Sequence, residues 1–148
     1  MNKVQMKRNE IYKDIFNSID INKSNGISRD QISLYLNRVF KNIDVDIEQA
    51  MGILDVMNIA SDAKINVNQF LSFMYIFENA ELEQVSSICF YLSDTNFSGK
   101  IDKNELRGMF VKLNIPADDE NVIEIVNNLG ELELDYEQFT EFISALVD

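Results

Sequence analysis

The stretch of sequence that decides the fold runs from Asp94 to Glu105 and reads D-T-N-F-S-G-K-I-D-K-N-E. Oxygen-bearing side chains occupy its first, third, fifth, ninth and twelfth positions, and a glycine occupies its sixth. A sharp turn at the sixth position requires positive φ, which glycine adopts without a steric cost. Oxygens arranged around such a turn are typical of a loop that wraps a hard cation.

The spacing follows the EF-hand pattern for Ca²⁺. In that pattern positions 1, 3 and 5, the carbonyl at position 7, position 9 through water and a bidentate glutamate at position 12 supply oxygens. The sequence therefore predicts one metal site, formed by Asp94, Asn96, Ser98, the carbonyl of Lys100, Asp102 and Glu105. Only three of these residues carry a negative charge, so we also expect Mg²⁺ to compete for the site.

The loop belongs to an internal repeat. One aliphatic residue lies near the middle of each of four polar loops, at intervals of roughly 33 to 38 residues: Ile27, Ile65, Ile101 and Leu134. Apolar spacings of three and four residues predict helices on both sides of the loops. They cover Tyr12–Ile19, Ile32–Phe40 and the approximate ranges 44–57, 67–79, 81–93, 103–113, 117–127 and 136–147.

These patterns predict an all-α chain of two EF-hand-pair lobes, 1–78 and 81–148, joined by a helical linker. The central aliphatic residue of each loop is expected to form a short strand that pairs with the next loop. Ile27 then pairs with Ile65, and Ile101 pairs with Leu134.

The other three loops depart from the ligand pattern. In the first, Asp20, Asn22, Ser24 and Ser28 could bind a cation, but Gln31 replaces the closing glutamate, so we expect a weak or silent site. The second loop has Ala60, Ala63 and Gln69 at positions 3, 6 and 12, and the fourth has Leu129, Leu132 and Gln138. Neither can form a cage of oxygens.

Composition limits the function further. The chain has 148 residues and a net charge of −12, which favours cations or a basic partner over nucleic acid and anionic membranes. The chain has no histidine and one cysteine, Cys89, which argues against an enzyme. The N-terminus has no signal-peptide pattern and no apolar stretch could span a bilayer, so we expect a cytoplasmic protein without membrane insertion.

Over nearly its whole length the sequence resembles the calmodulin superfamily, in its four repeats and in the approach from Phe16 to Asp20. Most of the calcium-binding loops of this chain are degenerate. In this respect it is similar to myosin light chains, both the essential light chains and those of unconventional myosins. This resemblance implies a light chain, cytoskeleton-associated, that holds an IQ-type helix of a myosin heavy chain largely without calcium. The basic amphipathic character of such a helix would suit the acidic chain.

The resemblance also implies an apolar groove in the C-terminal lobe. Its candidate residues are Phe90, Met109, Phe110, Leu113, Phe139, Phe142, Ile143 and Leu146. About half of them are instead expected to be core residues. The helix expected over 136–147 has no methionine, which favours one dedicated partner. The alternative is a calcium sensor or regulatory subunit that binds an enzyme or channel when calcium rises. A calcium buffer is less favoured.

Overall fold

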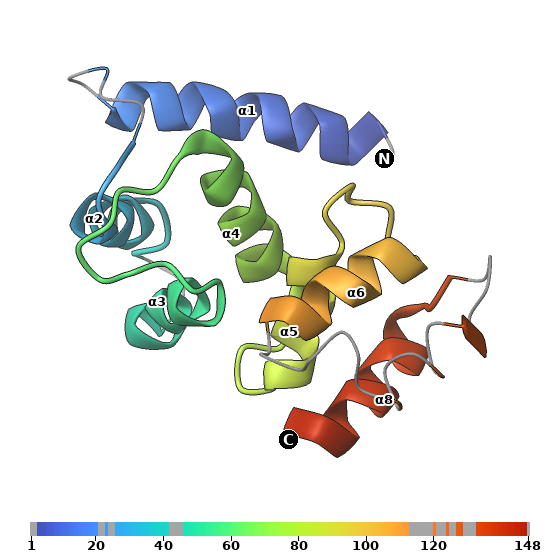
Figure 1. Cartoon of the computed structure of the whole chain (residues 1–148). Coiled ribbons are helices and arrows are strands. Elements are labelled where there is room, and N and C mark those ends of the chain that lie inside the picture. The colour runs from blue at the N-terminus through green and yellow to red at the C-terminus, as the bar shows by residue number, and fades with distance from the viewer. Residues whose placement is uncertain are drawn as a thin grey trace. The chain divides into compact units, whose positions relative to one another are not determined.

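The chain is an all-α protein in a computed structural model that describes residues 3–20, 23, 26–41, 46–112, 120, 124, 127–128 and 133–147 (Figure 1). The described helices are α1 (Lys3–Ile19), α2 (Arg29–Val39), α3 (Ile47–Val56), α4 (Val67–Asn79), α5 (Val85–Ser93), α6 (Lys103–Lys112) and α8 (Tyr136–Val147). The predicted fold class is confirmed. The helix expected over 117–127 falls almost entirely outside the described residues. No helix in the described part is long and apolar enough to cross a membrane.

The segment between α4 and α5 corrects one expectation. The predicted helical linker is wrong, because α4 ends at Asn79 and Ala80 is extended, with φ −79° and ψ 152°. Helix α5 then begins only at Val85 instead of at residue 81. A longer α4 would place Glu81 and Glu83 at its negative C-terminal end, whereas the observed break leaves them before the positive N-terminal end of α5.

The chain divides into two compact units, Met1–Glu83 and Gln84–Asp148. The division of the chain into two domains with the bounds 1–78 and 81–148 stays a prediction. In each unit, two loops are joined by a single antiparallel bridge, Ile27 with Ile65 and Ile101 with Leu134, as expected. The N–H···O distances across these bridges are 2.8–2.9 Å. In the N-terminal unit two helix–loop–helix motifs are joined in this way, which is the EF-hand-pair arrangement.

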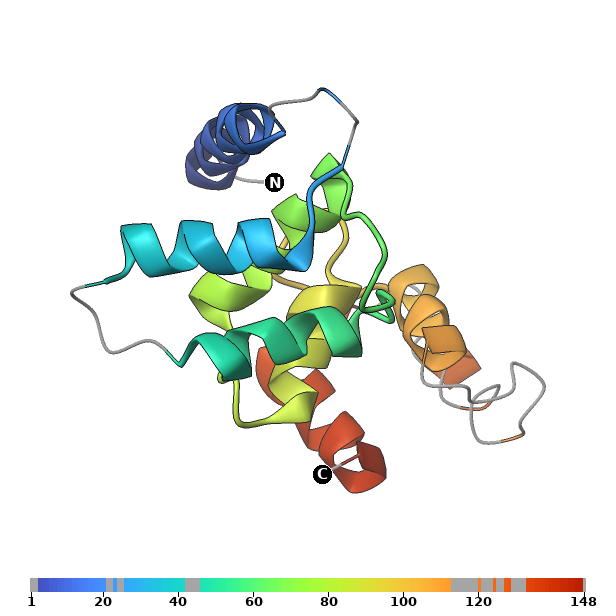
Figure 2. The ribbon, with the colours of Figure 1, turned by 90° about the vertical axis from the view of Figure 1, so that its left-hand side faces the viewer.

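The N-terminal unit is built around α4. Helices α1 and α3 both pack on α4, and α2 lies beside α3 (Figure 2). Phe70 on α4 is fully buried and its ring contacts those of Tyr12, Phe16 and Tyr35, from α1 and α2. Edge-to-face contacts of this kind stabilise a core beyond the area they bury. One side chain therefore holds three helices together.

The C-terminal unit is built around α5, which packs against α6 and α8. The Phe90 ring contacts Tyr136 and Phe139 of α8, and the Tyr136 hydroxyl lies 2.9 Å from the Ser87 hydroxyl. The apolar residues that follow the four loops, predicted as a repeat feature, are all fully buried: Ile32, Phe70, Leu106 and Phe139. In each case the core therefore anchors the helix that follows the loop.

Candidate metal site

Asp94 organises the first half of the loop between α5 and α6. Its side chain is buried, and Oδ1 accepts hydrogen bonds from the Ser98 amide at 2.9 Å and the Ser98 hydroxyl at 3.2 Å. Asp94 Oδ2 accepts one from the Gly99 amide at 2.8 Å. Gly99 has φ +83° with no atom crowding the place of a Cβ, so glycine is needed there for its backbone conformation.

The next ligand positions lie close to this carboxylate. Asn96 Oδ1 also accepts from the Ser98 amide, at 3.2 Å, and the Ser98 hydroxyl donates to the Lys100 carbonyl at 3.0 Å. The loop therefore gathers the oxygens of positions 1, 3, 5 and 7 around Ser98. These are four of the six predicted ligands.

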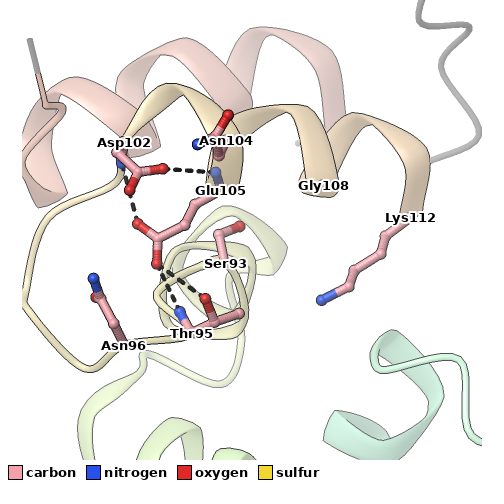
Figure 3. Close-up of a pocket in the computed structure, with 8 residues that line it drawn as sticks. All are labelled: Ser93, Thr95, Asn96, Asp102, Asn104, Glu105, Gly108 and Lys112. Carbon is pink, nitrogen blue, oxygen red and sulfur yellow. Dashed lines mark hydrogen bonds between the residues drawn. The ribbon is translucent and has the colours of Figure 1, made fainter. Parts of the chain in front are cut away.

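Asp102 and Glu105 close the loop at the start of α6. Glu105 N–H donates to Asp102 Oδ1 at 2.8 Å, and Asp102 N–H donates to Glu105 Oε1 at 3.1 Å. This reciprocal pair is a capping box, which satisfies two backbone donors at a helix N-terminus. The other oxygen, Glu105 Oε2, accepts from the Thr95 amide at 2.9 Å and the Thr95 hydroxyl at 3.2 Å, so Glu105 lies between Asp102 and Thr95 (Figure 3).

The three carboxylates of the predicted site do not converge on one point. Among the described residues, no group of three or more His, Cys, Asp or Glu side chains is close enough to hold a metal ion together. The pKa of Glu105 is raised by burial and, to a lesser extent, by the nearby carboxylates of Asp102 and Asp94, while hydrogen bonds from Asp102 and Thr95 act against the rise. A cation would offset the unfavourable placement of this charge.

The donor set itself suits Ca²⁺. Carboxylate, amide, hydroxyl and carbonyl oxygens are hard ligands, and no nitrogen or sulfur ligand belongs to the loop. A cavity of about 310 Å³ lies beside Glu105 (Figure 3). It is lined by Ser93, Thr95, Asn96, Asp102, Asn104, Glu105, Gly108 and Lys112.

Each of the other three loops has the same capping pair, with glutamine in place of Glu105. The amide N–H of position 9 donates to the glutamine Oε1 at 2.8–3.0 Å, and the glutamine N–H donates back to the side chain of position 9 at 2.8–3.2 Å. The pairs are Ser28 with Gln31, Asn66 with Gln69, and Asp135 with Gln138.

The metal-ligand pattern alone does not reveal this role of the glutamines. A second signal in the sequence does reveal it, because Ser, Thr, Asp or Asn followed three residues later by Glu or Gln marks a capping box. The four segments S-R-D-Q, N-V-N-Q, D-K-N-E and D-Y-E-Q all carry that signal.

Gln31 makes a further contact. Its side-chain N–H₂ donates to the carbonyl of Ile19, the last residue of α1, at 3.3 Å. Gln31 therefore connects the end of α1 to the start of α2. In an EF-hand that binds calcium, the ion makes this connection between the incoming and outgoing helices.

The weak site predicted in the first loop stays a prediction. Asp20 is buried, and the Ser28 hydroxyl already accepts a hydrogen bond from the Gln31 backbone N–H in the capping box. Asn22 and Ser24 lie outside the described residues.

The groove candidates of the C-terminal unit lie mainly in its core. Five of them are no more than 2% exposed: Phe90, Met109, Phe110, Phe139 and Ile143. Phe142 is partly exposed, and its ring contacts Phe110. Leu113 lies outside the described residues, as does the side chain of Leu146. An apolar surface in this unit would require its helices to move apart.

A second cavity, of about 400 Å³, lies between α1 and α2 in the N-terminal unit. The sequence pattern gave no indication of this cavity. Its lining residues are Ile15, Ser18, Ile19, Gln31, Leu34, Tyr35 and Arg38. Leu34 is 57% exposed, as is Ile11, one turn before Ile15 on α1. The cavity therefore opens beside exposed apolar side chains.

No protein-family model and no curated protein matches the chain. Among solved structures, calcium-loaded apo-aequorin from Aequorea victoria is similar with 15% identity and a TM-score of 0.37, over 95% of this chain and 88% of that one.

A structure described as a light-sensitive photoprotein matches with 13% identity and a TM-score of 0.37, over 100% of this chain and 85% of that one. Berovin, from the ctenophore Beroe abyssicola in its Ca²⁺-loaded apoprotein state, matches with 13% identity and a TM-score of 0.30, over 92% and 85% of the two chains. At such values these matches say nothing about what this chain binds, and the EF-hand-pair architecture rests on its own helices, loops and bridges.

Proposed function

We propose that this chain is a calcium-binding EF-hand protein with one Ca²⁺ site, in the C-terminal unit, and an N-terminal unit that binds a partner helix without calcium. The observation that carries the proposal is the set of four capping pairs. All four hold the start of a helix in the same way, but only the pair in Asp94–Glu105 contains the glutamate that can bind Ca²⁺ with two oxygens.

The loop between α5 and α6 already positions several of the oxygens that would bind Ca²⁺. Asp94, Asn96 and the Lys100 carbonyl each accept a hydrogen bond from Ser98. Asp102 and Glu105 would complete the oxygen set. Bound Ca²⁺ would supply positive charge that draws these oxygens together across the start of α6.

The N-terminal unit is proposed to act without calcium because glutamine replaces the closing glutamate in both of its loops. Gln31 and Gln69 cap α2 and α4, and Gln31 also connects α1 to α2. A neutral amide offers a cation one oxygen and no charge. The partner-binding surface of this unit then persists at any calcium concentration.

The partner proposed is a basic amphipathic helix, of the IQ type found in unconventional myosin heavy chains, so that the chain acts as a light chain and not as an enzyme. Long-range attraction supports a basic partner, because the chain carries a net charge of −12 and most of this charge belongs to Gln84–Asp148, which has thirteen acidic residues against four basic ones. The direct contact with the partner is proposed for the N-terminal unit. The N-terminal unit has a smaller net negative charge, with twelve acidic and nine basic residues.

The cavity between α1 and α2 offers this helix a place for one large apolar side chain. Ile15, Ile19, Leu34 and Tyr35 supply apolar walls. Arg38, the one charged lining residue, favours an acidic residue of the partner beside that apolar anchor.

Peptide binding tests the proposal and separates it from the alternative of a calcium-dependent sensor. An IQ-type peptide is titrated into the full chain by calorimetry, once with EGTA and once with excess Ca²⁺. The light-chain function predicts binding in both, with affinities that differ by less than about tenfold, or about 1.4 kcal/mol. Binding only with Ca²⁺ would favour the sensor, and binding in neither would reject the partner.

The surface is tested with a matched pair of variants. Leu34→Asp places a charge at the mouth of the cavity, and Val111→Asp places one on α6, where Val111 is 66% exposed. Neither side chain is buried, so both variants should fold. The proposal predicts that Leu34→Asp lowers peptide affinity in EGTA at least about tenfold, or about 1.4 kcal/mol, and that Val111→Asp leaves it unchanged. Equal effects of the two variants would move the binding surface elsewhere.

A further inference from the structure

Thr95 contacts the closing glutamate although it stands at position 2 of the loop, which is not a ligand position. Its amide N–H and its hydroxyl both donate to Glu105 Oε2, at 2.9 Å and 3.2 Å (Figure 3). The position-2 residues of the other loops are Ile21, Ile59 and Asn128. The only hydroxyl at position 2 is therefore in the only loop that ends in glutamate.

These bonds compete with the role of Glu105 as a ligand. A bidentate glutamate turns both oxygens toward the ion. In the structure Oε1 accepts from the Asp102 amide and Oε2 accepts both donors of Thr95. Within the described part of the chain, Glu105 does not join Asp94 and Asp102 in a three-carboxylate cluster. Closure of the loop on an ion therefore requires Oε2 to leave Thr95.

We propose that Thr95 is a positioning residue that holds Glu105 away from the ion and so lowers the calcium affinity of the loop. This inference rests on the proposed calcium function and specifies how the site is regulated. A ligand residue that is in its binding conformation only part of the time weakens the apparent affinity in proportion to that fraction. The hydroxyl of Thr95 therefore sets part of the calcium concentration at which the loop responds.

The test replaces Thr95 in the full chain with valine, which has the same shape but no hydroxyl, and with serine, which keeps the hydroxyl. Calcium affinity is measured by calorimetry, and association and dissociation rates by stopped flow. The bond from the Thr95 hydroxyl is exposed to solvent and 3.2 Å long, so its net contribution is that of an ordinary hydrogen bond, about 0.5 to 1.5 kcal/mol, and Thr95→Val should bind Ca²⁺ about two- to tenfold more tightly. Thr95→Ser should bind as the wild type does.

The rates distinguish this positioning role from a general change of the loop. Because the bonds from Thr95 act before the ion is bound, Thr95→Val should raise the association rate and leave the dissociation rate unchanged. Thr95→Ala removes the same hydroxyl and should also associate faster with an unchanged dissociation rate. With two variants, the test still works if one of them fails to fold.

Unchanged or weaker binding by Thr95→Val, or an equal gain in Thr95→Ser, would overturn the proposal while the calcium function stands. A gain that arises only from slower dissociation would also overturn it. A wild-type chain that binds no Ca²⁺ would overturn both this proposal and the calcium function.

Discussion

At the scale of single residues, position 12 of each loop has two separable roles. The side-chain oxygen of Glu or Gln caps the following helix in all four loops, whereas binding of Ca²⁺ requires the carboxylate. Three loops retain the first role alone. This explains how the chain keeps four similar loops in its fold while only one of them matches the ligand pattern of calcium.

Glu105→Gln should separate the two roles. Calcium binding should fall at least about a hundredfold, or about 2.7 kcal/mol, because the bidentate charged ligand is lost. The free energy of unfolding without calcium should change by less than about 0.5 kcal/mol, because glutamine makes the same capping box in the other loops. Calorimetry and urea denaturation measure the two effects.

Glu105→Ala is the matched comparison, since it loses both the carboxylate ligand and the hydrogen bond from the Asp102 amide, while its own backbone N–H still donates to Asp102. Its unfolding free energy should drop by about 1 kcal/mol more than that of Glu105→Gln. Equal stability of the two variants would show that the capping pair has no energetic role.

At the scale of helices, Gln31 and Phe70 hold the N-terminal unit together by different means. Gln31 joins the end of α1 to the start of α2 through hydrogen bonds, and Phe70 fills the core between α1, α2 and α4. Neither contact involves a cation. The arrangement of these helices is therefore an intrinsic property of the unit.

Gln31→Ala removes the side-chain half of the capping box of α2 and the bond to Ile19, while Gln69→Ala removes only the side-chain half of the capping box of α4. The backbone N–H of either position still donates to the N-cap side chain. We expect Gln31→Ala to lower the free energy of unfolding by about 1.5 to 2.5 kcal/mol and Gln69→Ala by about 1 kcal/mol. Urea denaturation of both variants measures the difference. If the two losses are equal, the bond between Gln31 and Ile19 contributes nothing.

Phe70→Ala should lower the free energy of unfolding by about 3 to 5 kcal/mol, because it leaves a cavity among three aromatic rings. Phe70→Leu keeps most of the side-chain volume and should lower the free energy of unfolding clearly less. Denaturation followed by tyrosine fluorescence reports the change, since Tyr12 and Tyr35 both contact Phe70. A loss below about 1 kcal/mol for Phe70→Ala would contradict the central place of this ring.

The helices were predictable because their apolar residues recur at helical spacing, and the pairing of Ile27 with Ile65 followed from the repeat. The end of α4 at Asn79 agrees with the predicted range 67–79, whereas the non-helical segment before Val85 was not predicted, because the sequence pattern placed the start of the next helix at residue 81. The contact of Thr95 with Glu105 depends on the side-chain conformation of Glu105, which spacing alone does not encode.

At the scale of the whole molecule, the two units differ in their relation to calcium and in charge. The C-terminal unit contains the one loop that matches the ligand pattern and has a large excess of acidic residues. The N-terminal unit has capped loops closed by glutamine and a cavity with apolar walls. Calcium is proposed to act on one unit, while the partner is held by the other at any calcium concentration.

An amide NMR titration of the full chain with Ca²⁺ tests this division most directly. We predict one saturable binding event that shifts the amides of Asp94–Glu105 and of Leu134, which is bridged to Ile101, and leaves those of 26–31 and 65–69 unchanged. Shifts of similar size in both units at the same calcium concentration, or no shift in Asp94–Glu105, would contradict it.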